Sequence, residues 1–179
     1  MPIALLDDAG TRLYYEDSGA PSANYTTLVL VHGSGFHSGK GYLHTTLIPG
    51  VLINVFAASF QRMIPCAAEH NLRLIIPNLR DYPHSTPYTA EELEDLRGPS
   101  RERQEKALQS RGLELAAFLK EVVKSDPSIG PMSLLAWSAG HCQTNALFAY
   151  ADHVPKDTIE LLNTHLRSYI LYGTCFQSA

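Results

Sequence analysis

Ser138 is the residue whose neighbours best suit it for chemistry. It follows the apolar run 132–136 and precedes a helical pattern, so a tight turn between a strand and a helix is predicted there. Such a turn brings two backbones close together, and the small residues Ala136 and Gly140 leave room for that approach. N–H groups at the start of the helix would face negative charge that develops beside the serine. The Ser138 hydroxyl is therefore a candidate nucleophile.

Two further segments place polar residues directly after buried-strand patterns. His32-Gly33-Ser34-Gly35 follows the aliphatic run 27–31, and the loop 78–86 follows the apolar run 72–76. The carboxyl ends of parallel strands meet at one edge of a sheet, where α/β proteins place their sites. We therefore expect both loops to converge on Ser138.

Strand patterns alternate with helical patterns along most of the chain. Buried strands are predicted at 27–31, 72–76 and 132–136, and a final strand is predicted at 168–172. Helices are predicted at 65–70, 100–124, 139–151 and 157–166. The apolar stripe of the longest helix is predicted to contain Leu108, Leu115, Leu119 and Val122. This alternation predicts an α/β fold with a doubly wound, mostly parallel sheet and right-handed crossovers.

The turn at Ser138 resembles the nucleophile elbow Gly-x-Ser-x-Gly of the α/β-hydrolase superfamily, with Ala136 in place of the first glycine. The segment after the run 27–31 resembles the His-Gly oxyanion loop of that superfamily. The loop 78–86 resembles its Asp-x-x-Gly-x-Gly-x-Ser loop, with Asn78 for the aspartate and with Tyr82 and His84 in place of small residues. The resemblance covers about residues 26–172 and is nearest to single-domain serine hydrolases, fungal members among them.

This resemblance implies an α/β-hydrolase fold and a serine hydrolase whose partner is a small-molecule ester or other acyl substrate. Ser138 would be the nucleophile, and the N–H groups of Ala139 and of Ser34 or Gly35 would form the oxyanion hole. His32 would support the oxyanion loop and not act as a base. A serine argues against a dehalogenase or an epoxide hydrolase, whose nucleophile in this fold is aspartate. The resemblance implies neither a metal nor an organic cofactor.

The acid and the histidine that follow the serine in this superfamily are not evident in the sequence. The histidines after Ser138 are His141, His153 and His165, and the last two are expected at helix ends or on the surface. Four residues are expected to line the pocket: His37, His84, Trp137 and His141. Losing the histidine of a serine triad costs about 10⁶ in kcat. The alternative interpretation is therefore a catalytically inactive truncated fragment or a small-molecule binding module.

The chain is predicted to form one partial domain. Residues 1–25 are expected to form an N-terminal β-hairpin of the same sheet, and 26–179 a partial α/β-hydrolase domain without its C-terminal strands. An atypical apolar insertion at about 40–59 has two open explanations, a retained intron and a lid helix. The last predicted strand would expose an apolar sheet edge, so we expect marginal stability, aggregation or self-association through that edge.

Composition argues against several classes of function. A formal net charge of −4 and a pI near 6.0 give no basic footprint for nucleic acid, and the mixed charges at 101–106 predict a solvated helix face. The longest apolar stretch, 47–58, is too short to span a bilayer. The odd number of cysteines, without metal-ligand spacing, favours reduced thiols and a cytoplasmic location; they are Cys66, Cys142 and Cys175.

Overall fold

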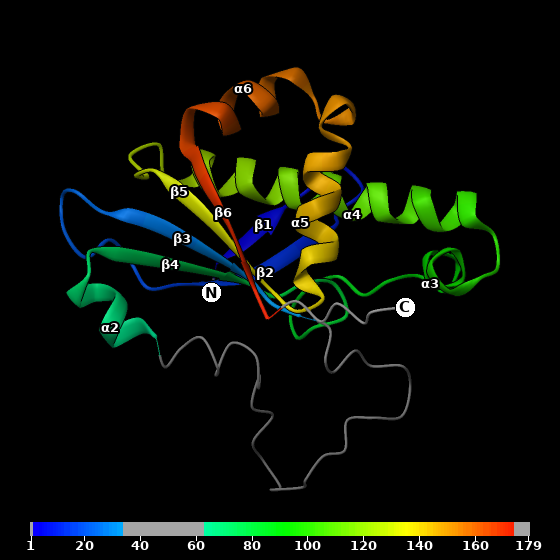
Figure 1. Ribbon diagram of the computed structural model, residues 1–179, viewed down its shortest axis with the longest axis horizontal. Helices are drawn as coiled ribbons and strands as arrows, with labels where there is room; N and C mark the ends of the chain where they lie inside the picture. The colour runs from blue at the N-terminus through cyan, green and yellow to red at the C-terminus, as the bar shows by residue number, and fades with distance from the viewer. Residues whose placement is uncertain (1, 34–62, 174–179) are drawn as a thin grey trace, which may run out of the picture.

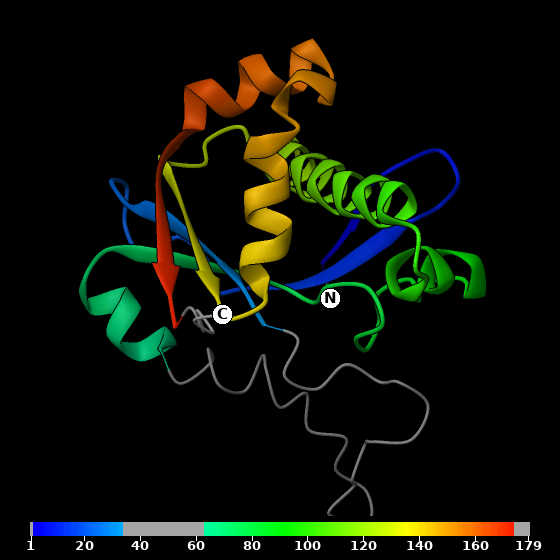
Figure 2. The same ribbon diagram turned by 45° about the vertical axis from the view of Figure 1, so that its right-hand side comes forward.

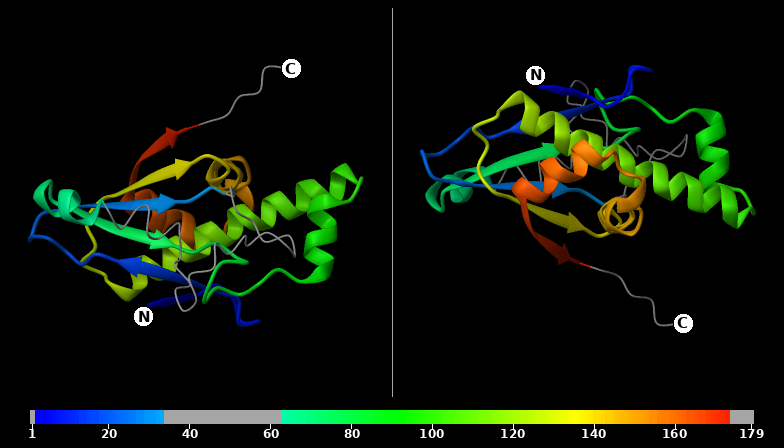
Figure 3. Two further views of the ribbon diagram at one scale, coloured as in Figure 1. Left: turned by 90° about the horizontal axis from the view of Figure 1, so that it is seen from below. Right: turned by 90° about the horizontal axis from the view of Figure 1, so that it is seen from above.

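The computed structural model describes residues 2–33 and 63–173, and within them it contains a sheet of six strands flanked by helices (Figure 1). The strands are β1 (Ile3–Leu5), β2 (Arg12–Asp17), β3 (Thr26–Val31), β4 (Leu72–Pro77), β5 (Met132–Trp137) and β6 (Leu166–Tyr172). Their order is β1-β2-β4-β3-β5-β6, so β1 and β6 lie at opposite edges (Figure 3). Strands β4, β3, β5 and β6 are parallel, which confirms the predicted mostly parallel sheet.

The first two strands form an antiparallel hairpin that is part of this sheet. Ile3 lies opposite Tyr14, and Leu5 lies opposite Arg12. Strand β2 then pairs antiparallel with β4, with Glu16 opposite Ile76.

The helices lie on both faces of the sheet. They are α2 (Ile64–Glu69), α3 (Ala90–Arg97), α4 (Arg101–Ser125), α5 (Gly140–Ala149) and α6 (Lys156–His165), with a 3₁₀ turn, η1 (Ala151–His153), after α5. Helices α4, α5 and α6 cover one face, and α2 lies on the other (Figures 1 and 2). None of the helices in the described part of the chain has the length and apolar character that a membrane crossing requires.

Strands β3 and β4 are buried on both faces because helices cover both faces of the sheet. On the α4 side, Val29 and Val31 of β3 pack in one core with Phe118 of α4, and all three side chains are fully buried. On the α2 side, Leu30 and Ile76 pack with Ala67 in a second, smaller core. Alternate residues of one strand thus enter different cores, which explains the continuous apolar runs in the sequence.

The helices differ from the sequence expectation in two places. Helix α3 was not predicted, and none of its residues is buried. It begins with a capping box instead: the Thr89 side chain accepts from the Glu92 N–H, and the Glu92 carboxylate accepts from the Thr89 N–H. In α4, Leu108 is exposed, whereas Ala107 and Arg111 are buried. The inward stripe of α4 is therefore shifted by one residue at its amino end.

Candidate active site

Ser138 lies in a strained turn between β5 and α5. Its φ angle is +52°, in the left-handed region that a residue with a Cβ rarely adopts. Strand β5 ends at Trp137 and α5 begins at Gly140, so the turn occupies two residues. Strain of this kind costs about 1–3 kcal/mol and persists only where the surroundings enforce it. This turn presents the serine at the carboxyl end of β5.

Close backbone packing enforces the turn from two sides. A Cβ on Gly140 would lie 2.5 Å from the Val31 carbonyl oxygen and 2.7 Å from that of His32. A Cβ on Gly33 would lie 2.8 Å from the Ser138 Cβ and 3.2 Å from the Ala139 nitrogen. The end of β3 therefore presses directly against the elbow, and both contacts require glycine.

The main chain of the elbow is held by hydrogen bonds. The Ser138 N–H donates to the Tyr172 carbonyl at 3.1 Å, and the His141 N–H donates to the Ser138 carbonyl at 3.2 Å. The Ala139 N–H has no hydrogen-bond partner among residues 2–33 and 63–173, and neither does the Ser138 hydroxyl. An N–H without a partner at the start of a helix can donate a hydrogen bond to a bound carbonyl oxygen as negative charge develops on that oxygen.

His32 is buried between the two loops that flank the elbow. Its Nδ1 donates to the Gly33 carbonyl at 2.9 Å, and its Nε2 accepts from the Leu79 N–H at 3.1 Å. Burial lowers the pKa of the imidazole, so the neutral form with a proton on Nδ1 is favoured. Both ring nitrogens are engaged, and His32 joins the two loops.

A cavity of about 80 Å³ lies beside the elbow. It is lined by His32, Gly33, Leu79, Arg80, Asp81, Tyr82, Tyr88, Ala139 and Gln143. The Gln143 Oε1 is buried there and has no hydrogen-bond partner among the described residues. The Tyr82 hydroxyl donates to the Gly33 carbonyl at 3.4 Å. Burial raises the pKa of Tyr82 to about 12, so its hydroxyl remains a donor at neutral pH. Sequence reasoning missed Gln143, although it lies one helical turn beyond Ala139.

Only some of the predicted site residues lie at the cavity. Ser34, Gly35, His37 and the insertion at 40–59 lie outside the described residues. Ala139 lines the cavity, but His84, Trp137 and His141 are not among its lining residues. His84 is exposed, with its ring 5.3 Å from that of Tyr14, and Trp137 packs against the smaller core. His141 is buried, and its Nε2 has no partner in the described part of the chain.

The loop after β4 follows the expected motif only in part. The left-handed residues are Asp81 and His84, both with φ of +69°, so Asp81 and not Tyr82 stands at the first position that favours a small residue. Asn78, in place of the aspartate, donates from Nδ2 to the Pro83 carbonyl at 2.9 Å. The Ser85 hydroxyl donates to the Asn78 carbonyl at 2.7 Å and closes the loop.

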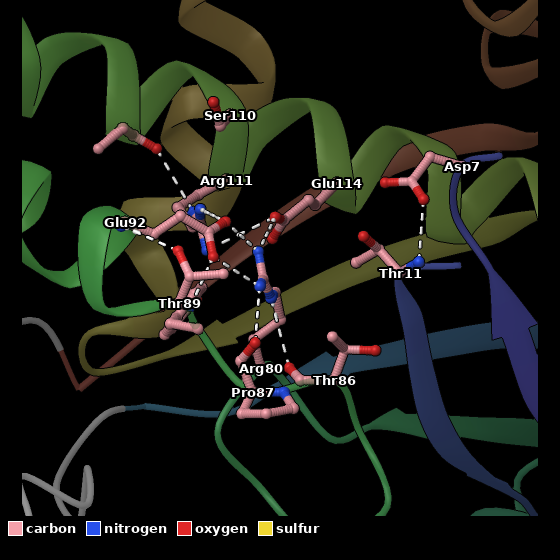
Figure 4. A network of polar contacts seen from close by, with 12 residues as sticks. Asp7, Thr11, Arg80, Thr86, Pro87, Thr89, Glu92, Ser110, Arg111 and Glu114 are labelled. Atoms are coloured by element: carbon pink, nitrogen blue, oxygen red, sulfur yellow. Dashed lines mark hydrogen bonds and ion pairs between the residues drawn. The ribbon is translucent and has the colours of Figure 1, made fainter. Parts of the chain in front are cut away.

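Arg80 anchors this loop to α3 and α4 (Figure 4). Its guanidinium is buried and forms ion pairs with Glu92 of α3 and Glu114 of α4. It also donates to the Pro87 carbonyl at 2.7 Å. The Tyr88 ring lies close to two guanidinium groups, 4.5 Å from that of Arg80 and 4.2 Å from that of Arg111. The network fixes the loop from which Leu79 and Tyr82 reach the site.

The described residues contain no acid and histidine pair at Ser138. His153 bonds Asp152 at 2.8 Å, but both side chains are exposed, at the far end of α5 from the elbow. The same residues contain no group of three or more His, Cys, Asp or Glu that could hold a metal ion.

Strain at Ser138 predicts a difference between two variants that both lack the hydroxyl. Ser138→Gly relieves the left-handed strain and Ser138→Ala retains it, so we expect the glycine variant to be about 1 kcal/mol more stable. Urea unfolding of both variants measures the difference. An alanine variant as stable as the glycine variant would contradict the strained turn.

Comparison with known proteins identifies the fold. No protein-family model matches the sequence, and no curated protein matches it. The epoxide hydrolase VrEH1 from Vigna radiata matches with a TM-score of 0.50 and 12% identity over 95% of this chain and 38% of its own. A mutant of VrEH2 matches with a TM-score of 0.51 and 12% identity over 90% of this chain and 35% of its own. A thermophilic esterase from Thermogutta terrifontis matches with a TM-score of 0.49 and 16% identity over 97% of this chain and 44% of its own.

The chain therefore has the α/β-hydrolase fold, with a strained elbow at the carboxyl end of β5. It spans somewhat more than a third of the length of the two VrEH structures. At 12% identity the likeness shows the fold alone.

Proposed function

We propose that this protein is a serine hydrolase that uses Ser138 to cleave small-molecule esters or other acyl compounds. The observation that carries the proposal is the left-handed Ser138, held between β5 and α5 beside an Ala139 N–H without a partner in the described chain. A strained turn costs stability, and such strain is typical of functional sites.

The proposed reaction has two steps. The Ser138 Oγ attacks the carbonyl carbon of the substrate, the bond to the leaving group breaks, and the serine proton passes to the leaving group through a base. Water then attacks the acyl-serine ester, releases the acid and returns a proton to Ser138. The Ala139 N–H donates to the oxyanion in both steps, and one such donor contributes about 3 kcal/mol. The resemblance of the loop after β3 to the His-Gly oxyanion loop implies that the second donor is the N–H of Ser34 or Gly35.

One observation favours a second candidate, a non-catalytic binding module. Within residues 2–33 and 63–173, no hydrogen bond joins the Ser138 hydroxyl to a histidine or to any other group. A serine hydroxyl without a base is a weak nucleophile. In that case the cavity beside the elbow would bind a small molecule without turnover.

A fluorophosphonate probe separates the two candidates. We expect the wild type to be labelled and Ser138→Ala not to be, because the probe reacts only with an activated serine. Ser168→Ala is the control, since Ser168 is an exposed serine of the edge strand β6. Its hydroxyl donates to the hydroxyl of Ser133 in β5. A folded wild type that takes no label would reject the hydrolase and leave the binding module.

We further propose that the protein self-associates through β6. Within the described residues β6 pairs only with β5, and its exposed side chains include Ile170, Leu171 and Tyr172. An exposed apolar edge strand favours pairing with another chain. Light scattering at rising concentration should show association of the wild type that Ile170→Lys weakens, whereas Leu108→Lys on the exposed side of α4 has no effect. A wild type that stays monomeric throughout would count against this edge.

We also propose a cytoplasmic location. Cys66 and Cys142 are free, exposed thiols, which persist most readily in a reducing compartment.

A further inference from the structure

The contact between Tyr82 and Gly33 joins the two loops that flank Ser138. Tyr82 lies in the loop after β4, and its hydroxyl donates to the carbonyl of Gly33, which lies after β3. The same carbonyl accepts from His32 Nδ1 at 2.9 Å. The Tyr82 ring also packs edge-on against the His32 ring, with 4.2 Å between the ring centroids. We propose that Tyr82 is a positioning residue that holds Gly33 in place against the elbow.

The place of Gly33 matters because it sets the space beside the candidate oxyanion donor. Gly33 is so close to the elbow that a Cβ there would lie 2.9 Å from the Trp137 carbonyl oxygen and 3.2 Å from the Ala139 nitrogen. An oxyanion donor must lie about 2.7–3.1 Å from the oxygen that it stabilises. A shift of Gly33 by a few tenths of an ångström therefore changes the fit of a substrate carbonyl. The effect on catalysis rests on the proposed function, whereas the hold on Gly33 does not.

Tyr82 can act in this way because its own loop is fixed. The Tyr82 N–H donates to the Leu79 carbonyl at 3.2 Å, and the Leu79 N–H donates to His32 Nε2 at 3.1 Å. The intervening Arg80 is tied to α3 and α4 by buried ion pairs (Figure 4). The position of the Tyr82 hydroxyl beside Gly33 is thus fixed by the contacts of its loop with α3 and α4.

Tyr82→Phe tests the proposal because it removes the hydroxyl and keeps the ring against His32. Tyr150→Phe is the matched control, since it also removes a hydroxyl that donates a hydrogen bond, to Glu105 at 3.3 Å, at the far end of α5 from the elbow. We expect Tyr82→Phe to lower the rate of fluorophosphonate labelling, and kcat for p-nitrophenyl acetate, by about three- to tenfold at unchanged KM. We expect Tyr150→Phe to change neither rate. Equal rates for Tyr82→Phe and the wild type would overturn the role in positioning.

A second measurement follows the hydrogen bonding of the Gly33 carbonyl and needs no reaction. The sequence contains one Gly–Ser peptide, Gly33–Ser34, so carbonyl-¹³C glycine with ¹⁵N serine gives a single carbonyl resonance. Loss of a donor reduces the polarisation of a carbonyl, so this resonance should move upfield in Tyr82→Phe and stay in place in Tyr150→Phe. An unmoved resonance in Tyr82→Phe would overturn the proposal. A wild type that takes no label, with a resonance that still moves, would support the hold on Gly33 and reject the hydrolase.

Discussion

Arg80→Leu should destabilise the fold by about 3 kcal/mol, because it removes the cation that two carboxylates of the network share. The Arg80 side chain is 5% exposed, and those of Glu92 and Glu114 are 30% and 20% exposed. Loss of the guanidinium leaves Glu92 with Arg111 at 3.3 Å and leaves Glu114 with Arg111 at 3.5 Å. Urea unfolding at neutral pH measures the loss. Arg103→Leu is the control, because Arg103 pairs with Asp95 near the surface and should cost less than about 1 kcal/mol.

The same variant should change the response to acid. Burial alone would raise the pKa of Glu92, but hydrogen bonds from Arg80 and from the Thr89 N–H outweigh it and lower the pKa from 4.5 to about 2. A lowered pKa stabilises the fold above the ordinary value, and this stability is lost as the pH falls from about 4.5 towards 2. Glu114 differs, because burial raises its pKa despite both arginines. Between pH 4.5 and about 2, the free energy of unfolding should therefore fall less steeply with pH for Arg80→Leu than for the wild type. Equal slopes for the two proteins would argue against the network.

Gly140→Ala should destabilise the fold by about 3 kcal/mol and abolish fluorophosphonate labelling. The added methyl group would lie 2.5 Å from the Val31 carbonyl oxygen and 2.7 Å from that of His32. Both atoms belong to the backbone of β3 and its end, so they move only if α5 moves away from the sheet. Such a movement displaces the Ala139 N–H and Ser138 together. Thermal unfolding and labelling of the same preparation measure both effects.

Gly19→Ala is the matched control for this substitution. Gly19 has a φ of +77°, and no atom lies within 4 Å of the position that a Cβ would take. The change therefore adds backbone strain without a steric contact. It should cost about 1 kcal/mol and leave labelling intact. A Gly140→Ala protein that is no less stable than Gly19→Ala would show that α5 does not approach β3 as closely as described.

The elements that position the site were predictable because local patterns determine them. Continuous apolar runs located β3, β4 and β5, since β3 and β4 are buried on both faces and β5 is buried on one face and half-buried on the other. Ser100 caps the long helix, and its hydroxyl accepts from the Arg103 N–H, as a serine at a helix start favours. The elbow was predictable because a tight turn needs small residues on either side of Ser138.

Features that depend on contacts distant in sequence were not predictable. Arg80 and Glu114 are 34 positions apart, and nothing local distinguishes them from the exposed charges at 101–106. Helix α3 has no buried residue, so its only signal was the capping box at Thr89. The role of Tyr82 was not predictable, because its hydrogen bond to Gly33 spans 49 positions. In the sequence Tyr82 was recognised only as a replacement for a small residue.

The hydrogen bond from the Ser138 N–H to the Tyr172 carbonyl links the elbow to the end of β6, which is an edge strand. Edge strands open more readily than central ones in native-state hydrogen exchange. One side of the elbow therefore belongs to a region of low local stability, while β3 on the other side lies in the middle of the sheet. The amide proton of Ser138 should exchange with solvent together with those of β6 and faster than those of β3. The geometry of this serine is then only as persistent as the pairing of β5 with β6.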